Sequence, residues 1–250
     1  MSDITVVIPV HDPTEIFQNY LERALSSITE QTLLPAEVIL SGSVKPFYLD
    51  SLSKTYGQSV SVRFIYNSST STSSNLNFLA RQSTSEITKI LFQDDFLISK
   101  YVLQNISQKF RIQKKVWLVV ASKNYDDISG TYVRNIQPRF SKKISTGINT
   151  IGSPSVIAFR TASFINFNED LIWMLDCDWY LRMKHNYGRP IFLRKFGVAN
   201  RLHDHQATHT AQSMHEIEVA ATRASHSRFG PKFFGRSNSC ICKAPSIDES

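Results

Sequence analysis

Hydrophobic positions recur along the chain at two spacings, in short continuous runs and in longer segments with helical periodicity. Ile4–Val10 is a β-branched run, which predicts a buried strand. Apolar residues then return at helical spacing from Ile16 to Ile28, and a second apolar run covers Glu37–Leu40. This order of strand, helix and strand predicts a parallel crossover.

The start of the first helix carries a signal of its own. Asp12 suits an N-cap, Pro13 suits the first helical position, and Glu15 stands three residues after the cap, as in a capping box. We therefore expect the helix to begin directly after Asp12.

The same two spacings predict the remaining elements. Gly188 and Pro190 predict the end of the helix that covers residues 176–186. Residues 123–150 have weak periodicity and are expected to be irregular or antiparallel. The predicted strands cover residues 60–66, 90–92, 116–121, 154–159 and 191–196, and the predicted helices cover residues 49–56, 75–80, 101–110, 176–186 and 211–228.

This order of elements predicts an α/β fold. It has a mostly parallel, Rossmann-like nucleotide-binding sheet with helices on both faces, and a mixed C-terminal half. One domain is expected over residues 1–228, divided near residue 121. Residues 229–250 are rich in Gly, Pro, Ser and Asn, and they are expected to form a loosely ordered tail.

Two adjacent carboxylates, Asp94 and Asp95, follow the apolar run Ile90–Phe92. A carboxylate at the end of a buried strand is costly unless it is paired, hydrated or bound to a cation. The carboxyl edge of an open α/β sheet is also where ligands bind. The pair is therefore either a ligand site or part of a solvated loop behind a core strand.

Asp176 and Asp178 enter a predicted helix that is rich in large apolar residues. Acids in a first helical turn are favoured by the helix dipole, and this alone accounts for both of them. Alternatively, one of the two points into a cleft as a general base. Two further acidic pairs, Asp126–Asp127 and Glu169–Asp170, lie beside turn residues and are expected in solvated loops.

Four of the seven histidines crowd into one short segment, as His203, His205, His209 and His215. Their spacing permits a metal ligand without establishing one. A hard divalent cation that is held by carboxylates and substrate phosphates needs at most one of them.

Common nucleotide-binding and hydrolase signatures are missing from the sequence. There is no GxxxxGK[ST], no GxGxxG after the first strand and no GxSxG. A sheet that ends in acids without a phosphate-cradling glycine loop suggests that a metal bridges the phosphates instead. That arrangement suits a nucleoside diphosphate leaving group.

The bulk composition, 42% hydrophobic and 20% charged, fits a globular protein with a sizeable core. No apolar run approaches the roughly 20 residues of a membrane span, and no signal-peptide pattern is present, so a cytoplasmic location is the default expectation. Cys177, Cys240 and Cys242 form no CxxC and are expected to be reduced.

The net charge of +7 is unevenly distributed. Residues 100–160 carry 11 basic and 2 acidic side chains, whereas residues 1–99 carry 6 basic and 10 acidic ones. The middle of the chain therefore offers a positive surface to nucleic acid, lipid headgroups or a phosphate-bearing substrate. A solvated basic face without a partner is the alternative.

The segment Thr5–His11, the helix after it, and Gln31–Leu40 resemble the opening of the family 2 glycosyltransferases. These are nucleotide-sugar-dependent enzymes of the type A fold, and most of them invert the anomeric centre. The family pattern continues with an Asn-bearing helix, here at Asn75, and with an Asp-x-Asp-like motif, here Phe92–Asp95.

The pattern closes with two further elements. A carboxylate precedes an Arg-containing helix, here Asp176–Arg182, and an Arg-x-His-x-x-Gln element follows as Arg201–Gln206. The resemblance spans residues 4–210. The motifs in this order and at this spacing are more specific for the family than any single motif is.

The resemblance implies a nucleotide-binding side. Pro9, Val10 and His11 would border the base and ribose, and Ser41 and Asn75 belong to the same side. Where the family often carries an acidic pair before Gly-Ser, this chain has Ser41-Gly42-Ser43, so the resemblance leaves the identity of the nucleotide open.

The resemblance also implies a metal and a base. Asp95 would bind Mn²⁺ or Mg²⁺ at the diphosphate, with Asp94 near the ribose or the metal, and His203 would complete the metal or diphosphate site. Asp176 would deprotonate the acceptor hydroxyl, and Asp178 is its rival for that role.

The function implied is that of an inverting glycosyltransferase. It would move a sugar from a nucleotide diphosphate donor to a hydroxyl of a growing glycan of the polysaccharide, O-antigen or capsule type, free or lipid-linked. Residues 1–121 would bind the nucleotide sugar, and residues 122–228 would form the acceptor and catalytic half. No nucleic acid is expected as a partner.

Three further hypotheses remain open. The basic middle and residues 229–234 would lie peripherally on an anionic inner membrane surface. A non-catalytic polyanion- or nucleic-acid-binding protein that uses the basic 100–160 segment is the main alternative function. A nucleotidyltransferase, which releases pyrophosphate, would also need metal-binding acids on a similar sheet.

Overall fold

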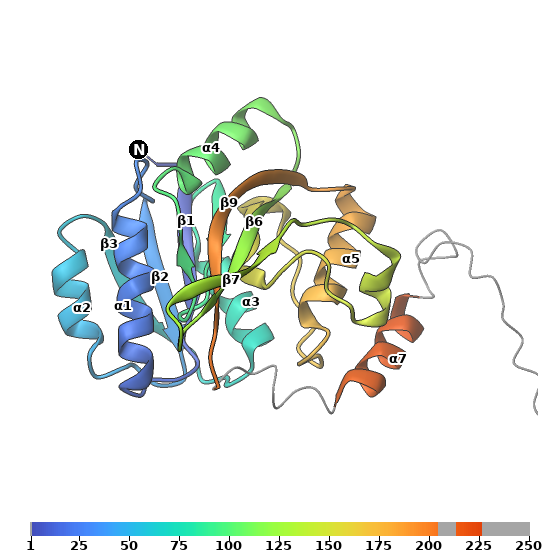
Figure 1. Cartoon of the computed structure of the whole chain (residues 1–250), viewed down its shortest axis with the longest axis horizontal. Helices are drawn as coiled ribbons and strands as arrows, with labels where there is room; N and C mark the ends of the chain where they lie inside the picture. The colour runs from blue at the N-terminus through green and yellow to red at the C-terminus, as the bar shows by residue number, and fades with distance from the viewer. Residues whose placement is uncertain (1, 205–213, 227–250) are drawn as a thin grey trace, which may run out of the picture.

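The computed structural model describes residues 2–204 and 214–226. The expected tail at 229–250 lies outside these residues, as do His205, His209 and the end of the Arg-x-His-x-x-Gln element. Within the described part, one mixed sheet runs through the molecule in the order β3-β2-β1-β4-β8-β6-β9-β5, and β7 pairs with β6 (Figure 1).

The N-terminal half of the sheet is parallel, as predicted. β1 (Ile4–Pro9) pairs with β2 (Glu37–Gly42) on one side and with β4 (Ile87–Ile90) on the other, and β3 (Ser61–Tyr66) pairs with β2. β1 is buried along its whole length, which matches its continuous β-branched composition. The carboxyl ends of these strands therefore meet at one edge.

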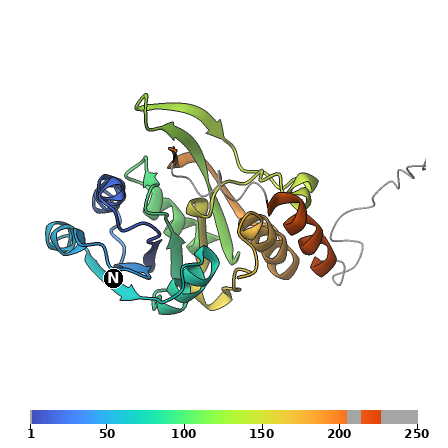
Figure 2. The same cartoon turned by 90° about the horizontal axis from the view of Figure 1, so that it is seen from below.

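Helices cover both faces of the parallel half. α1 (Ile16–Thr29) and α3 (Thr72–Gln82) lie on opposite faces in Figure 2, and α2 (Leu49–Tyr56) packs beside α1. α4 (Val102–Ile112) follows the short strand β5 (Phe96–Leu97). The α/β architecture expected from the sequence is confirmed.

The C-terminal half is mixed. β8 (Ile157–Arg160) runs antiparallel between β4 and β6 (Trp117–Asp126), and β9 (Ile191–Leu202) is parallel to β6. β7 (Thr131–Ile136) forms an antiparallel hairpin with β6 that projects from the molecule (Figure 2). Residues 123–136 thus adopt the antiparallel alternative.

Two helices complete this half. α5 (Leu175–Tyr187) ends at Gly188, which has a φ of 76°, at the predicted stop. α7 (His215–His226) lies beside α5 in Figures 1 and 2. Three short 3₁₀ turns, η1 (Lys142–Thr146), η2 (Pro154–Val156) and η3 (Thr161–Ser163), connect the strands and helices. None of the described helices is both long enough and apolar enough to cross a membrane.

Some element boundaries differ from the predictions. The first helix begins at Ile16 and not after Asp12, whose carboxylate accepts the backbone N–H of Thr14 at 2.8 Å and so forms a local turn. The fourth strand ends at Ile90, four residues before Asp94, and β9 continues past its predicted end to Leu202. The longer β9 carries Arg201 and His203 to the edge of the sheet where Asp94 lies.

Candidate active site

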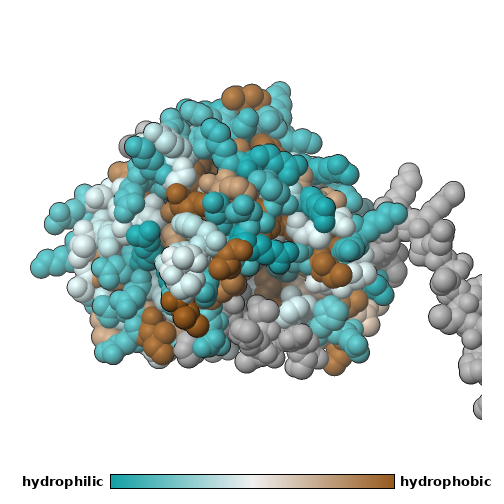
Figure 3. Space-filling view, in the orientation of Figure 1, coloured by the Kyte–Doolittle hydropathy of each residue, from teal (hydrophilic) through white to brown (hydrophobic). Residues whose placement is uncertain are grey.

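A pocket of about 510 Å³ opens at the carboxyl edge of the sheet. Figure 3 shows a hollow with hydrophobic residues at its floor between β9 and α5. Three sequence-distant regions form its polar wall, namely the loop after β1, the loop after β4 and the end of β9. Its lining includes His11, Gln93, Asp94, Asp95, Asn149, Ser153, Trp173, Asp176, Asn200 and His203.

Asp94 and His203 form a pair inside this pocket. The imidazole Nε2 lies 3.0 Å from Asp94 Oδ2, and the two side chains are 4% and 20% exposed, respectively. The ring of His203 is held by Phe17 and Tyr20 of α1, at centroid distances of 5.7 and 5.1 Å. The aromatic contacts fix the imidazole so that its Nε2 meets the carboxylate.

Asp95 is buried more deeply than Asp94. Its Oδ1 accepts the backbone N–H of Arg201 at 3.0 Å, and its Oδ2 accepts the Asn200 amide at 3.1 Å. Burial and the neighbouring Asp94 raise the pKa of the Asp95 carboxyl. Asp95 is therefore hydrogen-bonded to the end of β9. The Asp94 carboxylate is the more accessible of the two.

Lys89 is a fully buried charge beneath this motif. Its Nζ donates to the carbonyl of Ile90 at 2.5 Å and to that of Ser155. Burial lowers the pKa of the Lys89 ammonium to about 7, and Asp95 partly offsets this. The Ser155 hydroxyl in turn accepts the N–H of Phe92 at 2.8 Å, so this cluster ties η2 to the loop that carries the acids.

Gln93 joins the acidic motif to the loop after β1. Its Oε1 accepts the N–H of His11 at 2.6 Å, and its Nε2 donates to the carbonyl of Asp12 at 3.1 Å. A carboxylate at this position could not donate the second bond. Gln93, which directly precedes the acidic pair, therefore has a structural role that nothing in the sequence indicated.

Asp176 lies on another wall of the pocket, in the first turn of α5. Its Oδ2 accepts the Asn149 amide at 2.5 Å, and its Oδ1 accepts the N–H of Cys177 at 2.6 Å. Burial raises the pKa of Asp176 to about 6. Asn149 itself is held by the N–H groups of Ile151 and Gly152, so it orients the carboxylate. Nothing in the sequence around Asn149 indicated this contact.

Asp178 occupies a different environment. It is 2% exposed and forms an i,i+4 ion pair with Arg182, at 2.6 Å from the Nη2 to Oδ2. Arg182 also donates to the carbonyl of Asn166 at 2.7 Å. Asp178 does not line the pocket, whereas Asp176 does.

Arg201 joins the end of β9 to two other elements. Its guanidinium pairs with Asp127 and donates from Nε to the carbonyl of Asp94 at 2.9 Å. It also lies 4.3 Å from the ring centroid of Tyr20, whose hydroxyl donates to Asp127 at 2.7 Å. Asp127 was expected in a solvated loop. It does lie in the turn that follows β6, but its carboxylate is only partly exposed and is paired with Arg201.

The remaining predicted nucleotide-side residues lie behind the pocket. Asn75 donates to the carbonyl of Ser41 at 2.7 Å, and the N–H of Val10 donates to the same oxygen at 2.8 Å. A Cβ at Gly42 would lie 2.6 Å from the carbonyl oxygen of Val10, so the close approach of β1 and β2 requires glycine here. Of the predicted nucleotide-side residues, His11 lines the pocket, whereas Pro9, Val10, Ser41 and Asn75 do not.

The wall that carries Asp176 is held from behind by α7. The Glu218 carboxylate, 3% exposed, accepts the N–H groups of Ile172, Trp173 and Met174 at 2.8–2.9 Å. These amides precede α5, so the carboxylate also faces the positive end of the helix dipole. The apolar spacing of residues 211–228 predicted a helix here, but it did not indicate the contact of Glu218.

The donor groups suit a hard divalent cation. No cluster of three or more His, Cys, Asp or Glu side chains positioned for a metal occurs among the described residues. The pocket instead offers the Asp94 carboxylate and the His203 imidazole, while the Asp95 carboxylate behind them is hydrogen-bonded to Arg201 and Asn200. Oxygen donors with one imidazole suit Mn²⁺ or Mg²⁺, which take further ligands from substrate phosphates and water.

This sheet order, with acids at its carboxyl edge, is the type A glycosyltransferase fold. The structure of S. aureus TarS 1-349 in complex with UDP-GlcNAc superposes with a TM-score of 0.69 at 17% identity, covering 93% of this chain and 71% of that one. The mannosyltransferase PcManGT from Pyrobaculum calidifontis, in complex with GDP-Man and Mn²⁺, has a TM-score of 0.65 at 15% identity, covering 89% and 64%.

A longer structure of S. aureus TarS is matched over 95% of this chain but only 44% of its own length, with a TM-score of 0.63. No protein-family model matches the sequence, and no curated protein matches it. At these identities the likeness defines the fold.

Proposed function

We propose that the chain is a glycosyltransferase of the family 2 type that moves a sugar from a nucleotide diphosphate donor to a hydroxyl of a glycan. One observation carries the proposal: a single pocket holds the Asp94–His203 pair on one wall and Asp176 on another. A donor diphosphate suits the first wall, and an acceptor hydroxyl suits the second. The fold neighbours were solved with UDP-GlcNAc and GDP-Man, which favours this class of donor.

Asp94, Asp95 and His203 are the proposed residues of the donor side. Bound Mn²⁺ or Mg²⁺ supplies charge neutralisation for the departing nucleoside diphosphate. Asp94 is the proposed main protein ligand because it is more accessible than Asp95, whose carboxylate is engaged with Arg201 and Asn200. Gln93 holds the His11 loop against the acids, which supports a role for His11 beside the nucleotide.

Asp176 is the proposed general base. Its pKa of about 6 keeps it mostly ionised at neutral pH while leaving it basic enough to accept the proton of a hydroxyl. Asn149 holds the carboxylate in place, so little reorganisation accompanies proton transfer. Attack by a hydroxyl on the face opposite the leaving diphosphate inverts the anomeric centre. Trp173 and Ile172 add an apolar surface beside the base that suits the face of an acceptor sugar.

The test is a panel of UDP- and GDP-sugars with Mn²⁺, assayed for release of the nucleoside diphosphate with the wild-type protein and two variants. Asp94→Asn is expected to lose both metal-dependent nucleotide binding and turnover. Asp176→Asn is expected to keep nucleotide binding and lose turnover. Absence of metal-dependent nucleotide binding across the panel contradicts the proposal, and release of pyrophosphate in place of the diphosphate indicates a nucleotidyltransferase.

A further inference from the structure

A second cavity, of about 680 Å³, lies between α4 and the first half of β9. Gly197 lines this cavity and stands six positions before His203 of the candidate active site. At ~3.3 Å per residue, the two sites lie on the order of 20 Å apart along β9. The groove is therefore distinct from the donor pocket, and the proposed reaction assigns it no role.

A bulge in β9 provides the charge of this groove. Val120 of β6 pairs with Leu193 and Ala121 pairs with Phe196, so Arg194 and Lys195 have no partner residue on β6. Both side chains are exposed at the rim of the groove. Bulges re-aim side chains out of a sheet, and here the bulge presents two adjacent cations.

The opposite wall comes from α4 and adds a third cation and an aromatic ring. Lys109 lines the groove, and Tyr101 lines it with 47% of its surface exposed. Phe192 and Phe196 complete the aromatic lining. None of the described residues that line the groove is Asp or Glu.

The surrounding chain is depleted of acids. Residues 96–125, 128–168 and 189–203 contain no Asp or Glu, and the first of these segments alone holds six basic residues. Asp3 reaches one of these six, Arg111, at 3.4 Å, outside the groove lining. Three cations, Lys109, Arg194 and Lys195, and the aromatic lining thus coincide at one concave site.

We propose that this groove binds an acidic polysaccharide chain. Cations recognise its carboxylate or phosphate groups, and aromatic rings suit the apolar faces of its sugars. A concave groove favours a single extended chain over a flat bilayer, and the roughly 20 Å along β9 to the candidate active site is a length that a polymer of a few sugars spans. The groove would hold an acceptor glycan at a point remote from the end that receives the sugar, and this role as an acceptor site rests on the proposed transfer function.

The test measures binding of polygalacturonate, with neutral dextran and phosphatidylglycerol vesicles as separate probes. The wild-type protein is expected to bind polygalacturonate in a salt-sensitive manner and to bind neither other probe. The double variant Lys109→Glu/Lys195→Glu is expected to raise the Kd for polygalacturonate by about tenfold or more. Each substitution replaces a cation that attracts the acidic polymer with a carboxylate that repels it.

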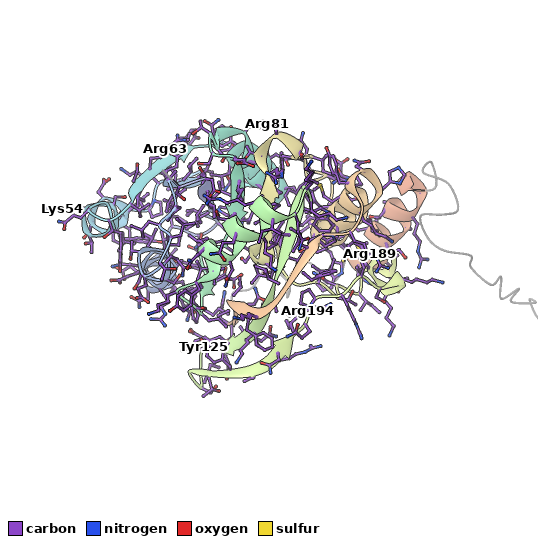
Figure 4. The ribbon with its side chains drawn as sticks, turned by 90° about the horizontal axis from the view of Figure 1, so that it is seen from above. Lys54, Arg63, Arg81, Tyr125, Arg189 and Arg194 are labelled. Carbon is purple, nitrogen blue, oxygen red and sulfur yellow. The ribbon has the colours of Figure 1, made fainter. Side chains whose placement is uncertain are left out.

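A matched control carries the same change of charge elsewhere. Lys54→Glu/Arg81→Glu alters two cations that Figure 4 places far from Arg194, and it is expected to leave the Kd nearly unchanged. Equal losses in both double variants, or no binding of polygalacturonate by the wild type, overturn the proposal. Capture by the vesicles without binding of polygalacturonate overturns it in favour of a membrane surface.

Tyr101→Ala provides a second variant that keeps the charge, and it is expected to weaken polygalacturonate binding without changing the salt dependence. Thermal unfolding of every variant verifies folding. The binding assay uses no nucleotide sugar, so its failure is distinguishable from failure of the proposed transfer activity.

Discussion

Asp176 and Asp178 stand two residues apart in the first turn of α5, and the sequence offers either as a base. The helix directs them to different surroundings, because residues two apart do not share a helical face. Asp176 lines the pocket and is held by Asn149, whereas Asp178 is neutralised by Arg182. Their different partners lead to opposite predictions for the two substitutions.

The rate of sugar transfer should fall at acid pH. Asp176 acts as a base only when ionised, and its pKa is about 6, so activity is expected to decrease below that pH and to level off above it. Asp176→Asn should lower kcat by about 10²–10⁴-fold and leave nucleotide affinity unchanged. A pH–rate profile and nucleotide titrations measure both effects.

Asp178→Asn is the control for this prediction. It leaves Arg182 partly buried without its counterion and is expected to lower the free energy of unfolding by on the order of 3 kcal/mol. Its pH–rate profile should keep the inflection near 6. Urea denaturation and the same kinetic assay test this. If the pH–rate profile lost its inflection in Asp178→Asn and kept it in Asp176→Asn, Asp178 and not Asp176 would be the base.

At the scale of elements, α7 and α5 are joined through Glu218. One carboxylate satisfies three backbone N–H groups that precede α5 and therefore have no partner within that helix. The His215 ring also packs edge-on against Trp173, at a centroid distance of 6.0 Å. Helix α7 thus holds the segment that leads into Asp176.

Glu218→Ala should destabilise the protein by on the order of 2–4 kcal/mol, because charge-assisted bonds are lost and buried amides remain unsatisfied. Transfer activity should fall as well, since the segment before Asp176 loses its support. Glu216→Ala, an exposed acid on the same helix, should change stability by about 0.5 kcal/mol or less. Urea denaturation with parallel turnover measurements tests the pair, and equal effects of the two substitutions would contradict the role of Glu218.

At the scale of the whole molecule, the proposed ligand should stabilise the fold. A nucleotide that binds only the folded state at 100 times its Kd adds about 2.7 kcal/mol to the free energy of unfolding. For a chain of this size, the Tm is expected to rise by roughly 5–10 °C. UDP and GDP, each with Mn²⁺, are the first ligands to examine by thermal unfolding.

Chelation of the metal by EDTA should reverse this stabilisation, and Asp94→Asn should abolish it. Polygalacturonate serves as the comparison, because its proposed groove does not require a metal. A shift of Tm that persists in EDTA would place the nucleotide outside the Asp94–His203 pair.

The local pattern of apolar and polar residues was sufficient to predict many of the strands and helices. The β-branched run of β1 predicted a buried strand, and the spacing of apolar residues predicted α1 and α5. The pattern was less informative where a tertiary contact competes with a local signal. Asp12 has the properties of an N-cap, yet it closes a turn before α1, because Gln93 holds the backbone of His11 and Asp12 against the acidic motif.

The sequence by itself determined the alternation of strands and helices, the parallel half of the sheet and the positions of the acids and His203, because these depend on periodicity and on residue type. Only the tertiary structure decided which acid faces the pocket, that Asp127 pairs with Arg201 and that Glu218 supports the wall of Asp176. The contacts of Asp127 with Arg201 and of Glu218 with the segment before Asp176 join residues 44 or more positions apart, and Asp176 meets Asn149 across 27 positions. All of them depend on how strands and helices pack, which local periodicity does not encode.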